Sequence, residues 1–580
     1  TNGVSLVWAM HDDSATAIAK AQAILNAPET KLQAKTDHMN DLLNNQIPYF
    51  RCSDQDIVNV YYFLWAIHLM YYIDLSDENP DFYPHTQSAV NNFLGIHRYD
   101  AAMQIPVGSW AVDKEAFANG NVLRWKTMLP YANLDNGRIP ADNLGKTWHS
   151  GLWGGVTSHV AGAWKIYEHS GDLEFLAEAY AFYRALMWNE MPGFWGQQYY
   201  AADCLGYMAL ELGYPQSEAD HWQEVVNSDN IDNWFNYAWT NHGYTNYFGF
   251  GSDQGWNTFG HILTKDFPKD WARAMVETWA VEGPNGFLTN DLLAVRPRES
   301  WDQIELDAFF ITPDTNTYML LGMFAGNVDD YATRLAIDHL KNYNMRWGIP
   351  IAPEAISKSY ELFGDQYSNF NAGKILVILE GIFGLSYSVV DSSFTVADNL
   401  PLEWDYMECY VPIGDGDNVN WTHVLVERSA QNGHSQKRAQ VKNNNQQTLN
   451  IQPWLEGKAI LQAPGTYSNE ANPGHIAYAI EGIGDHTLDL HLTEADQATL
   501  LRESFRLTES PQANNNEISI QFGLGSPPIV DTTIILQRAT QLGTDDFQEV
   551  YRFNSIDQSE TLSEGITSKV TPYYLSLIHI

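Results

Sequence analysis

Cysteine is scarce in this chain of 580 residues, which contains only Cys52, Cys204 and Cys409. The three lie far apart and match no metal-ligand spacing, which excludes a zinc module and a fold built on disulfides. Long apolar runs are absent too: no stretch of the sequence reaches the roughly 18 consecutive apolar residues that a membrane-spanning helix needs. The sequence therefore predicts no metal site and no membrane span, and nothing in it implies an organic cofactor.

Basic residues are also few: 32 Lys and Arg stand against 71 Asp and Glu, for a formal net charge of −39. Contacts to phosphates need Lys and Arg, so binding of nucleic acid through the bulk surface is excluded. High acidity favours solubility, and we expect a secreted or periplasmic protein. The oligomeric state cannot be read from the sequence.

Aromatic residues, by contrast, are abundant, at 13% of the chain with 20 Trp and 31 Tyr. Most tryptophans pack in protein cores. This load nevertheless exceeds what packing needs, and flat rings with polar edges suit the faces of sugars. We therefore predict a carbohydrate ligand, with candidate sugar platforms at Trp110, Trp148, Trp153, Trp256 and Trp301.

Helical periodicity dominates the first two thirds of the chain. The expected helices cover 15–25, 55–73, 116–129, 158–169, 173–188, 201–212, 217–227, 268–279, 315–324, 328–341 and 373–384. About a dozen helices in this length, joined by short turns and long loops, predict a helical toroid of two concentric rings, an (α/α)6 barrel, over residues 1–385. An α-solenoid would need a fixed repeat of about 20–50 residues, and the sequence shows none.

The character of the sequence changes after residue 385. Short runs of β-branched and aromatic residues predict strands within 394–412, 421–428, 449–451, 458–461, 475–480, 487–492, 518–522 and 532–536. Residues 386–580 are therefore expected to form a C-terminal β-sandwich, in a protein that is mainly α. Residues 575–580 look unrelated to the preceding domain and could be an artefact.

Loops between the expected helices carry residue types suited to sugar binding. Arg98 and Asp100 lie in the loop 93–110 and can hydrogen-bond sugar hydroxyls in pairs, or simply pair with each other. The segment before helix 158–169 contains Trp148, His149 and Trp153. Long loops with such a composition are usually functional.

Two further loops bear on proton transfer. Segment 190–200 contains Glu190, Gln197 and Gln198 ahead of a helix expected from residue 201. The amides can hydrogen-bond a sugar but cannot donate a catalytic proton. Segment 298–307 carries four acids beside Trp301 and offers Asp302 as a general-acid candidate.

Glu354 is the carboxylate candidate with the stiffest surroundings. It lies in a loop bounded by Pro350 and Pro353, and prolines restrict the backbone, which is one way to hold a carboxylate in place. Tyr360 follows closely and is a candidate sugar contact. A purely structural acid in this loop is the alternative interpretation.

Taken in order, these motifs resemble the (α/α)6 glycoside hydrolases: the α-glucosidase I group with its bacterial family 63-like relatives, and the related trehalases and glucoamylases. The similar segments are the loop 136–140 (NGRIP), the helix end 164–172, the first sugar loop 98–100 and the helix start 313–318. Segment 399–404 resembles the opening of the β-sandwich in the related disaccharide phosphorylases. The likeness covers about residues 90–410.

The resemblance implies an inverting glycoside hydrolase. Glu354, shortly before 371–374 (NAGK), falls where these families keep the general base, which activates a water while an acid protonates the leaving oxygen. The families carry that acid in the loop that reads FWGQQ here, without a carboxylate. Three readings stay open: Glu190 is the acid, an acid of 299–307 such as Asp302 is, or Gln197 or Gln198 replaces a carboxylate.

Two other functions also stay open. Polysaccharide lyases use helical toroids followed by β-sandwiches as well. They need a Tyr or His base and a group that neutralises a uronate, and the available residues are His149, His159, His242, Tyr244 and Asn246. The missing acid at Gln197 and Gln198 also allows a carbohydrate-binding protein on a catalytically dead hydrolase fold.

Overall fold

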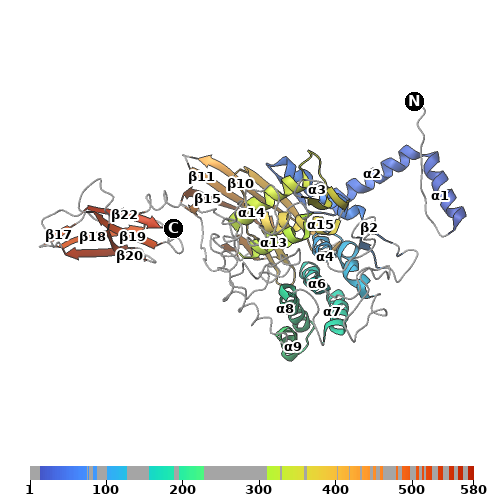
Figure 1. Ribbon diagram of the computed structural model, residues 1–580, viewed down its shortest axis with the longest axis horizontal. Coiled ribbons are helices and arrows are strands. Elements are labelled where there is room, and N and C mark those ends of the chain that lie inside the picture. The colour runs from blue at the N-terminus through green and yellow to red at the C-terminus, as the bar shows by residue number, and fades with distance from the viewer. Residues whose placement is uncertain are drawn as a thin grey trace.

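Figure 1 shows the computed structural model of the chain, with helices in the middle of the molecule and strands toward its C-terminal end. The structure describes residues 13–74, 76, 83–87, 101–126, 156–188, 195–227, 310–311, 313–326, 329–357, 362–366, 368–401, 403–416, 419–431, 434–443, 448–451, 458–460, 478–480, 486–496, 505–507, 512–514, 517–524, 533–539, 548–553, 559–565 and 573–579. The helix expected at 268–279 lies outside these ranges.

Several helices begin at a capping carboxylate. The Asp172 side chain accepts hydrogen bonds from the backbone N–H groups of Glu174 (2.9 Å) and Phe175 (3.0 Å) and starts α7 (Leu173–Met187). The Asp54 side chain caps α3 (Gln55–Met70) in the same way. The other helices are α1 (Ser14–Asn26), α2 (Pro28–Asn45), α4 (Ala101–Gly108), α5 (Gly120–Leu123), α6 (Val156–Ser170), α8 (Trp195–Glu211), α9 (Gln216–Asn227), α13 (Pro313–Ala325), α14 (Asp329–His339) and α15 (Ser368–Leu376), with π-helical segments η1 (Glu115–Asn119), η7 (Leu340–Asn344) and η8 (Val377–Ile382).

Alternate helices form one inner row. α13 packs against α15, α15 against α4, α4 against α6, and α6 against α8. The helices between them contact this row: α14 packs on α13, α3 on α15, α7 on α6 and α8, and α9 on α8. This alternation is the arrangement of an α/α toroid, and Figure 1 shows these helices gathered in the body of the molecule.

The N-terminal turns of three inner helices meet at Gly373. A Cβ atom on Gly373 of α15 would lie 2.7 Å from Cγ2 of Thr317 in α13 and 2.8 Å from Sδ of Met103 in α4. All three residues lie in the first two turns of their helices. Glycine allows this close approach, and α4, α13 and α15 therefore point their N-terminal ends toward the same end of the row.

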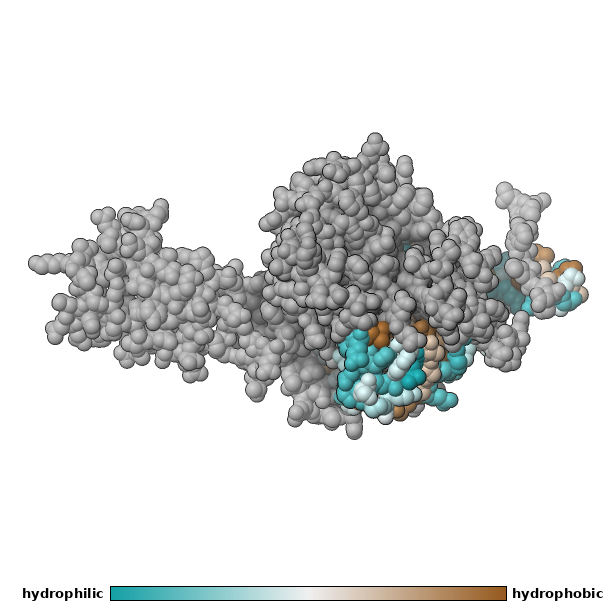
Figure 2. Space-filling view, turned by 60° about the horizontal axis from the view of Figure 1, so that its bottom comes forward, coloured by the Kyte–Doolittle hydropathy of each residue, from teal (hydrophilic) through white to brown (hydrophobic). Residues whose placement is uncertain are grey.

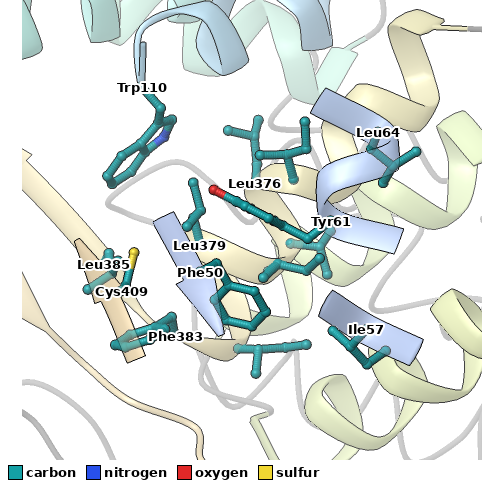
Figure 3. Packing of buried hydrophobic residues seen from close by; sticks show 14 of the residues in the cluster. Phe50, Ile57, Tyr61, Leu64, Trp110, Leu376, Leu379, Phe383, Leu385 and Cys409 are labelled. Atoms are coloured by element: carbon teal, nitrogen blue, oxygen red, sulfur yellow. The ribbon is translucent and has the colours of Figure 1, made fainter. Parts of the chain in front are cut away.

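One hydrophobic core joins the helices to a β-sheet. Phe50 of strand β1 (Tyr49–Cys52) packs on Tyr61 of α3 and on Phe383, with ring centroids 5.0 and 6.3 Å away. Figure 3 shows these rings beside Cys409 of strand β9. Because Cys409 and Val424 belong to the same buried cluster, the core continues across the boundary predicted at residue 385.

The largest sheet is antiparallel and has the strand order β1-β9-β10-β11-β15-β13. After β1, its strands are β9 (Tyr406–Ile413), β10 (Asn420–Gln431), β11 (His434–Asn443), β15 (His486–Asp496) and β13 (Lys458–Ile460). A second sheet has the order β14-β12-β8-β7, formed by β14 (Tyr478–Ile480), β12 (Thr448–Ile451), β8 (Ser393–Val396) and β7 (Leu385–Ser388).

Two sheets contain the last strands, which Figure 1 places together at one end of the molecule. One contains β16 (Phe505–Leu507), β17 (Gln512–Asn514), β18 (Glu517–Leu524) and β21 (Ser559–Gly565); the other contains β19 (Thr533–Ala539), β20 (Gln548–Phe553) and β22 (Tyr573–His579). Residues 575–579 thus pair along β19. The C-terminal β-sandwich stays a prediction. Several strands fall within the predicted ranges, whereas β11, β16, β17, β20, β21 and β22 lie outside them. The described residues also form two small sheets. One pairs β2 (Tyr72–Ile73) with β3 (His85–Thr86), and the other has the order β4 (Phe310–Ile311), β5 (Pro353–Ser357), β6 (Leu362–Gln366).

Several elements differ from the expectation. Residues 101–108 form α4, although Pro106 and Gly108 predict a loop. The burial of Met103, Ile105 and Val107 stabilises the helix and outweighs the low helix propensity of proline and glycine. Helix α8 begins at Trp195 instead of residue 201. Helix α2 and strand β1 were not predicted at all.

The described surface carries few large apolar side chains. Figure 2 brings forward the bottom of the view in Figure 1, where α7, α8 and α9 lie. The large coloured patch there is mostly hydrophilic, with scattered hydrophobic residues. Within the described ranges, none of the helices combines the length and the apolar character needed to cross a lipid bilayer.

Candidate functional site

A buried polar cluster holds the chain immediately before Glu354. The Tyr343 hydroxyl and the Asn371 amide both donate to the carbonyl oxygen of Pro353, at 3.1 and 3.0 Å. The Asn344 amide donates to the Ile351 carbonyl at 2.7 Å, and the Ile351 N–H donates to the Asn344 carbonyl at 2.8 Å. Tyr343, Asn344 and Asn371 are fully buried. We call Tyr343, Asn344, Asn371 and Lys374 the 353 clamp.

Lys374 closes the 353 clamp. Its ammonium group donates to Oδ1 of Asn344 (2.9 Å) and of Asn371 (3.0 Å), and lies 3.8 Å from the centroid of the Tyr343 ring. Asn371 and Lys374 are one turn apart on α15, a spacing that places both on one helix face. The Lys374 side chain is fully buried, and burying an ammonium group costs free energy unless the group is well hydrogen-bonded. These contacts order the amides that grip residues 351–353.

The charge of Lys374 also acts on the neighbouring His339, which stacks on Tyr343 with ring centroids 4.9 Å apart. Burial, and then the Lys374 ammonium, hold the pKa of His339 well below its ordinary value. Neutral His339 therefore packs against the clamp as an uncharged ring.

Glu354 stands at an irregularity between two strands. In the antiparallel pair β5 (Pro353–Ser357) and β6 (Leu362–Gln366), Pro353 lies opposite Gln366 while Ala355 lies opposite Phe363. Glu354 alone therefore faces two residues, Gly364 and Asp365. Such bulges re-aim a side chain and are common beside active sites. The side chain of Glu354 itself lies outside what the structure describes.

The predicted site residues precede inner helices in the chain. Arg98 and Asp100 come directly before α4; Trp148, His149 and Trp153 before α6; Glu190 before α8; Trp301 and Asp302 before β4 (Phe310–Ile311) and α13; Glu354 and Tyr360 before α15. Strand β4 pairs with β5, so the segment leading to α13 lies next to the strand of Glu354. The N-terminal ends of α4, α13 and α15 lie at the same end of the row. The chain therefore enters all three helices from that end.

Most of these side chains fall outside the described residues, and their positions stay predictions. This holds for Arg98, Asp100, Trp148, His149, Trp153, Glu190, Trp256, Trp301, Asp302 and Tyr360. Gln197 and Gln198 lie on the first turn of α8, where a loop was expected, and only their backbone is described.

Trp110 is not a sugar platform. It lies just after the C-terminal end of α4, away from the end where the N-terminal turns meet, and is fully buried. Its indole N–H donates to Oε1 of Glu380 at 2.7 Å, and the ring packs edge-on against His169 and Tyr387, with centroids 5.0 and 5.5 Å away. Lys165 pairs with the same Glu380 oxygen at 2.5 Å. Sequence cannot separate such a core Trp from an exposed one.

His159, one of the bases considered for a lyase, is also buried. It lies on α6 with its ring centroid 5.5 Å from that of Trp125, and no part of it is exposed. In this position it cannot reach a polysaccharide. The other lyase candidates, His149, His242, Tyr244 and Asn246, lie outside the described residues.

Local sequence patterns do not indicate the 353 clamp as a functional unit. The segment 371–374 enters the resemblance only by its position after Glu354, and no motif includes Tyr343 or Asn344. A lysine and an asparagine one turn apart on an apolar helix were the available signal, because such a lysine needs buried partners.

No group of three His, Cys, Asp or Glu side chains in the described part of the chain is placed to hold a metal ion. The three cysteines are buried free thiols.

The described fold resembles that of two α-L-rhamnosidases. The structure of α-L-rhamnosidase from Dictyoglumus thermophilum aligns with a TM-score of 0.53 at 11% identity, over 77% of this chain and 50% of that one. The Streptomyces avermitilis α-L-rhamnosidase complexed with L-rhamnose aligns with a TM-score of 0.51 at 12% identity, over 77% and 42%. The chain thus spans half or less of the length of these proteins. Identities this low establish a shared fold and no shared chemistry.

Sequence comparison adds nothing to this likeness, because no family model and no curated protein matches the chain. The likeness agrees with the predicted α/α toroid. The finer resemblance to the α-glucosidase I group stays a prediction.

Proposed function

We propose that this protein is a glycoside hydrolase in which Glu354 activates the water that attacks the glycosidic bond. The observation that carries the proposal is the restraint on the chain at Glu354. Two fully buried side chains hold the carbonyl that precedes it, and a bulge faces it across the hairpin. A general base must be held in position to within a fraction of an ångström, and such support is what positions it.

The fold supports the same reading. The candidate residues precede inner helices of the α/α row in the sequence, which is consistent with one shared site, and two α-L-rhamnosidases share the fold. We therefore propose α-L-rhamnosides as the first substrate class to test. A secreted or periplasmic location, where glycans are met, accords with the excess of acidic residues.

The proposed mechanism is inverting hydrolysis. Glu354 takes a proton from water on one face of the sugar while a carboxylic acid on the other face, Glu190 or Asp302, protonates the leaving oxygen. The two carboxyl groups must stand about 6.5–9.5 Å apart to leave room for the water. Gln197 and Gln198 then hydrogen-bond sugar hydroxyls.

The test measures hydrolysis of an aryl α-L-rhamnoside and of neutral and uronate-containing glycans, following reducing ends and ultraviolet absorbance together. We expect reducing ends without absorbance, and a loss of about 10²–10⁴-fold in kcat for Glu354→Gln, the usual contribution of general base catalysis. Proton NMR of the first product formed should show the inverted anomer. The matched control is Glu224→Gln, an exposed glutamate on α9, which should leave kcat unchanged.

Other outcomes identify the alternatives. Absorbance that survives Glu354→Gln overturns the hydrolase in favour of a lyase. An inactive chain that gains activity through Gln197→Glu or Gln198→Glu is a homologue that lacks its acid. A fully active Glu354→Gln variant would remove Glu354 from the mechanism.

A further inference from the structure

A hollow lies on the face of the large sheet that points away from the helices. It has a volume of about 640 Å³ and lies over β1, β9 and β10, beside the end of α2. Along β1 and β9 burial alternates: Phe50 and Cys409 point into the core, while Tyr49 and Tyr410 point outward into the hollow. The sheet therefore separates this hollow from the helical core.

Tyr49, Tyr410 and Trp421 line the hollow, and His423 extends the row of rings behind Tyr410. Tyr49, Tyr410 and His423 are directly opposite one another in the register of β1, β9 and β10. Tyr410 stacks on His423 with centroids 4.3 Å apart and meets Tyr49 edge to face at 5.7 Å. Trp421 precedes His423 by two residues in β10 and therefore lies on the same face of the sheet. The row thus places flat rings at the surface, where contacts between neighbouring rings hold them.

Exposure of these rings is unusual for this protein. Tyr49 is 39% exposed and Tyr410 37%. Among the Tyr, Phe and Trp side chains in the described part of the chain, only two others, Tyr214 and Trp347, are exposed to this degree. Two of four such rings therefore stand side by side in one hollow, which packing of the chain itself does not require.

The polar groups of the hollow are balanced in charge. Arg51 Nη2 pairs with Oε2 of Glu408 at 2.9 Å, and His423 Nε2 lies 3.0 Å from Oε1 of the same carboxylate. The Asn44 and Asn45 amide nitrogens donate back into α2, to the Asn40 carbonyl and to Oδ1 of Asp41, both at 2.6 Å. The amides thus offer oxygen acceptors to the hollow, and Arg51, half exposed, offers N–H donors.

We propose that this hollow is a second, non-catalytic binding site for a neutral oligosaccharide. Rings to stack on a sugar face, acceptors and donors for hydroxyls, and a volume within the roughly 300–1,000 Å³ of small-molecule pockets fit one or two sugar units. A polyanion is disfavoured, because Glu408 already occupies the one arginine that lines the hollow and the chain carries a net charge of −39. The site goes beyond the proposed hydrolysis and shares no residue with it.

The test is affinity electrophoresis of the full chain in native gels containing arabinogalactan, glucomannan or soluble starch, with polygalacturonate as the anionic comparison. We expect at least one neutral polysaccharide to retard the protein. The double substitution Tyr49→Ala and Tyr410→Ala should weaken that binding at least tenfold, while Tyr410→Phe, which keeps the ring, retains most of it. Tyr214→Ala, which removes an exposed ring on the turn after α8, is the matched control and should bind normally.

Three results would overturn the proposal: no retardation by any neutral polysaccharide, equal retardation of the double variant, or retardation by polygalacturonate alone. A change of elution volume between wild type and double variant in size exclusion, without any sugar binding, would assign the face to a contact between copies. Should the double variant unfold on circular dichroism, Arg51→Gln provides the second measure, with an expected loss of severalfold. Since binding is read without turnover, failure of the hydrolase proposal would leave this result intact.

Discussion

Single residues decide how firmly Glu354 is held, and the Pro353 carbonyl is the point of contact. Tyr343→Phe removes one of its two hydrogen bonds and keeps the ring on which His339 stacks. We expect a loss of about 1 kcal/mol in the free energy of unfolding. We also expect kcat to fall severalfold with little change in KM, because the base loses positioning and the sugar contacts remain.

A matched control separates positioning from stability. The Tyr61 hydroxyl, likewise buried, donates to the Pro48 carbonyl at 2.7 Å, far along the chain from Glu354. Tyr61→Phe should cost about the same free energy of unfolding and leave kcat unchanged. Equal losses of kcat in both variants would show that Tyr343 acts only on stability.

Residue identity alone misled the sequence analysis at Trp110. Trp148 and Trp110 look alike in sequence, each near a glycine and ahead of a helix-rich stretch. Trp110 is nevertheless enclosed by Glu380, His169 and Tyr387, which come from segments about 60 to 280 residues away. Whether a ring meets solvent depends on those distant segments, and no local pattern reports them.

Among elements, the junction between η8 and β7 leaves no room for a side chain at Gly384. Gly384 has a φ of +64°, and a Cβ atom there would lie 1.9 Å from the Ala397 carbonyl oxygen. Gly384→Ala must move the backbone where the Ala397 N–H donates to the Gly384 carbonyl at 2.8 Å. We expect a loss of at least about 3 kcal/mol, measured by chemical unfolding.

The control for this junction is Gly213→Ala. Gly213 also has a positive φ, +78°, but a Cβ atom there would meet no neighbour within 4 Å. Only the backbone penalty of about 1–2 kcal/mol remains. If both variants lost the same stability, the close approach to Ala397 would not limit this junction.

Local signals predicted elements well where they did not conflict. The buried helix expected at 55–73 is α3, and the strand expected at 487–492 is β15, because an apolar pattern and flanking turn signals agree there. At α4, proline and glycine pointed to a loop while buried neighbours imposed a helix. Boundaries and helices of mixed composition are therefore where prediction failed.

For the whole molecule, four buried histidines make stability depend on acidity. Burial lowers the pKa of His68 to about 3 and of His85 to about 4, and it is the main cause that holds the pKa values of His169 and His339 well below the ordinary value. In the unfolded chain each of these histidines has the ordinary pKa of about 6.5. Below that pH the unfolded state holds more protons, so stability is fully present above about 6.5 and is lost as pH falls toward 4.

The expected slope is about 1.4 kcal/mol per pH unit for each histidine. Thermal melting between pH 7 and pH 4.5 should show a steep fall in Tm, and His68→Leu should make it shallower. Leucine also removes two ring nitrogens that have no hydrogen-bond partner in the described structure, so stability at pH 7 should be kept or raised. A melting temperature independent of pH over this range would contradict the burial of these groups.

The sequence by itself determined the local structure of much of this protein: where many of the helices and strands form, and where Asp172 starts a helix. These follow from spacings and caps within a few residues. Only the tertiary structure decided that β1 pairs with β9 more than 350 residues later, that Trp110 is enclosed, and that Tyr343 and Asn371 grip Pro353. Such contacts join distant segments through burial and hydrogen bonding, which depend on the whole folded chain.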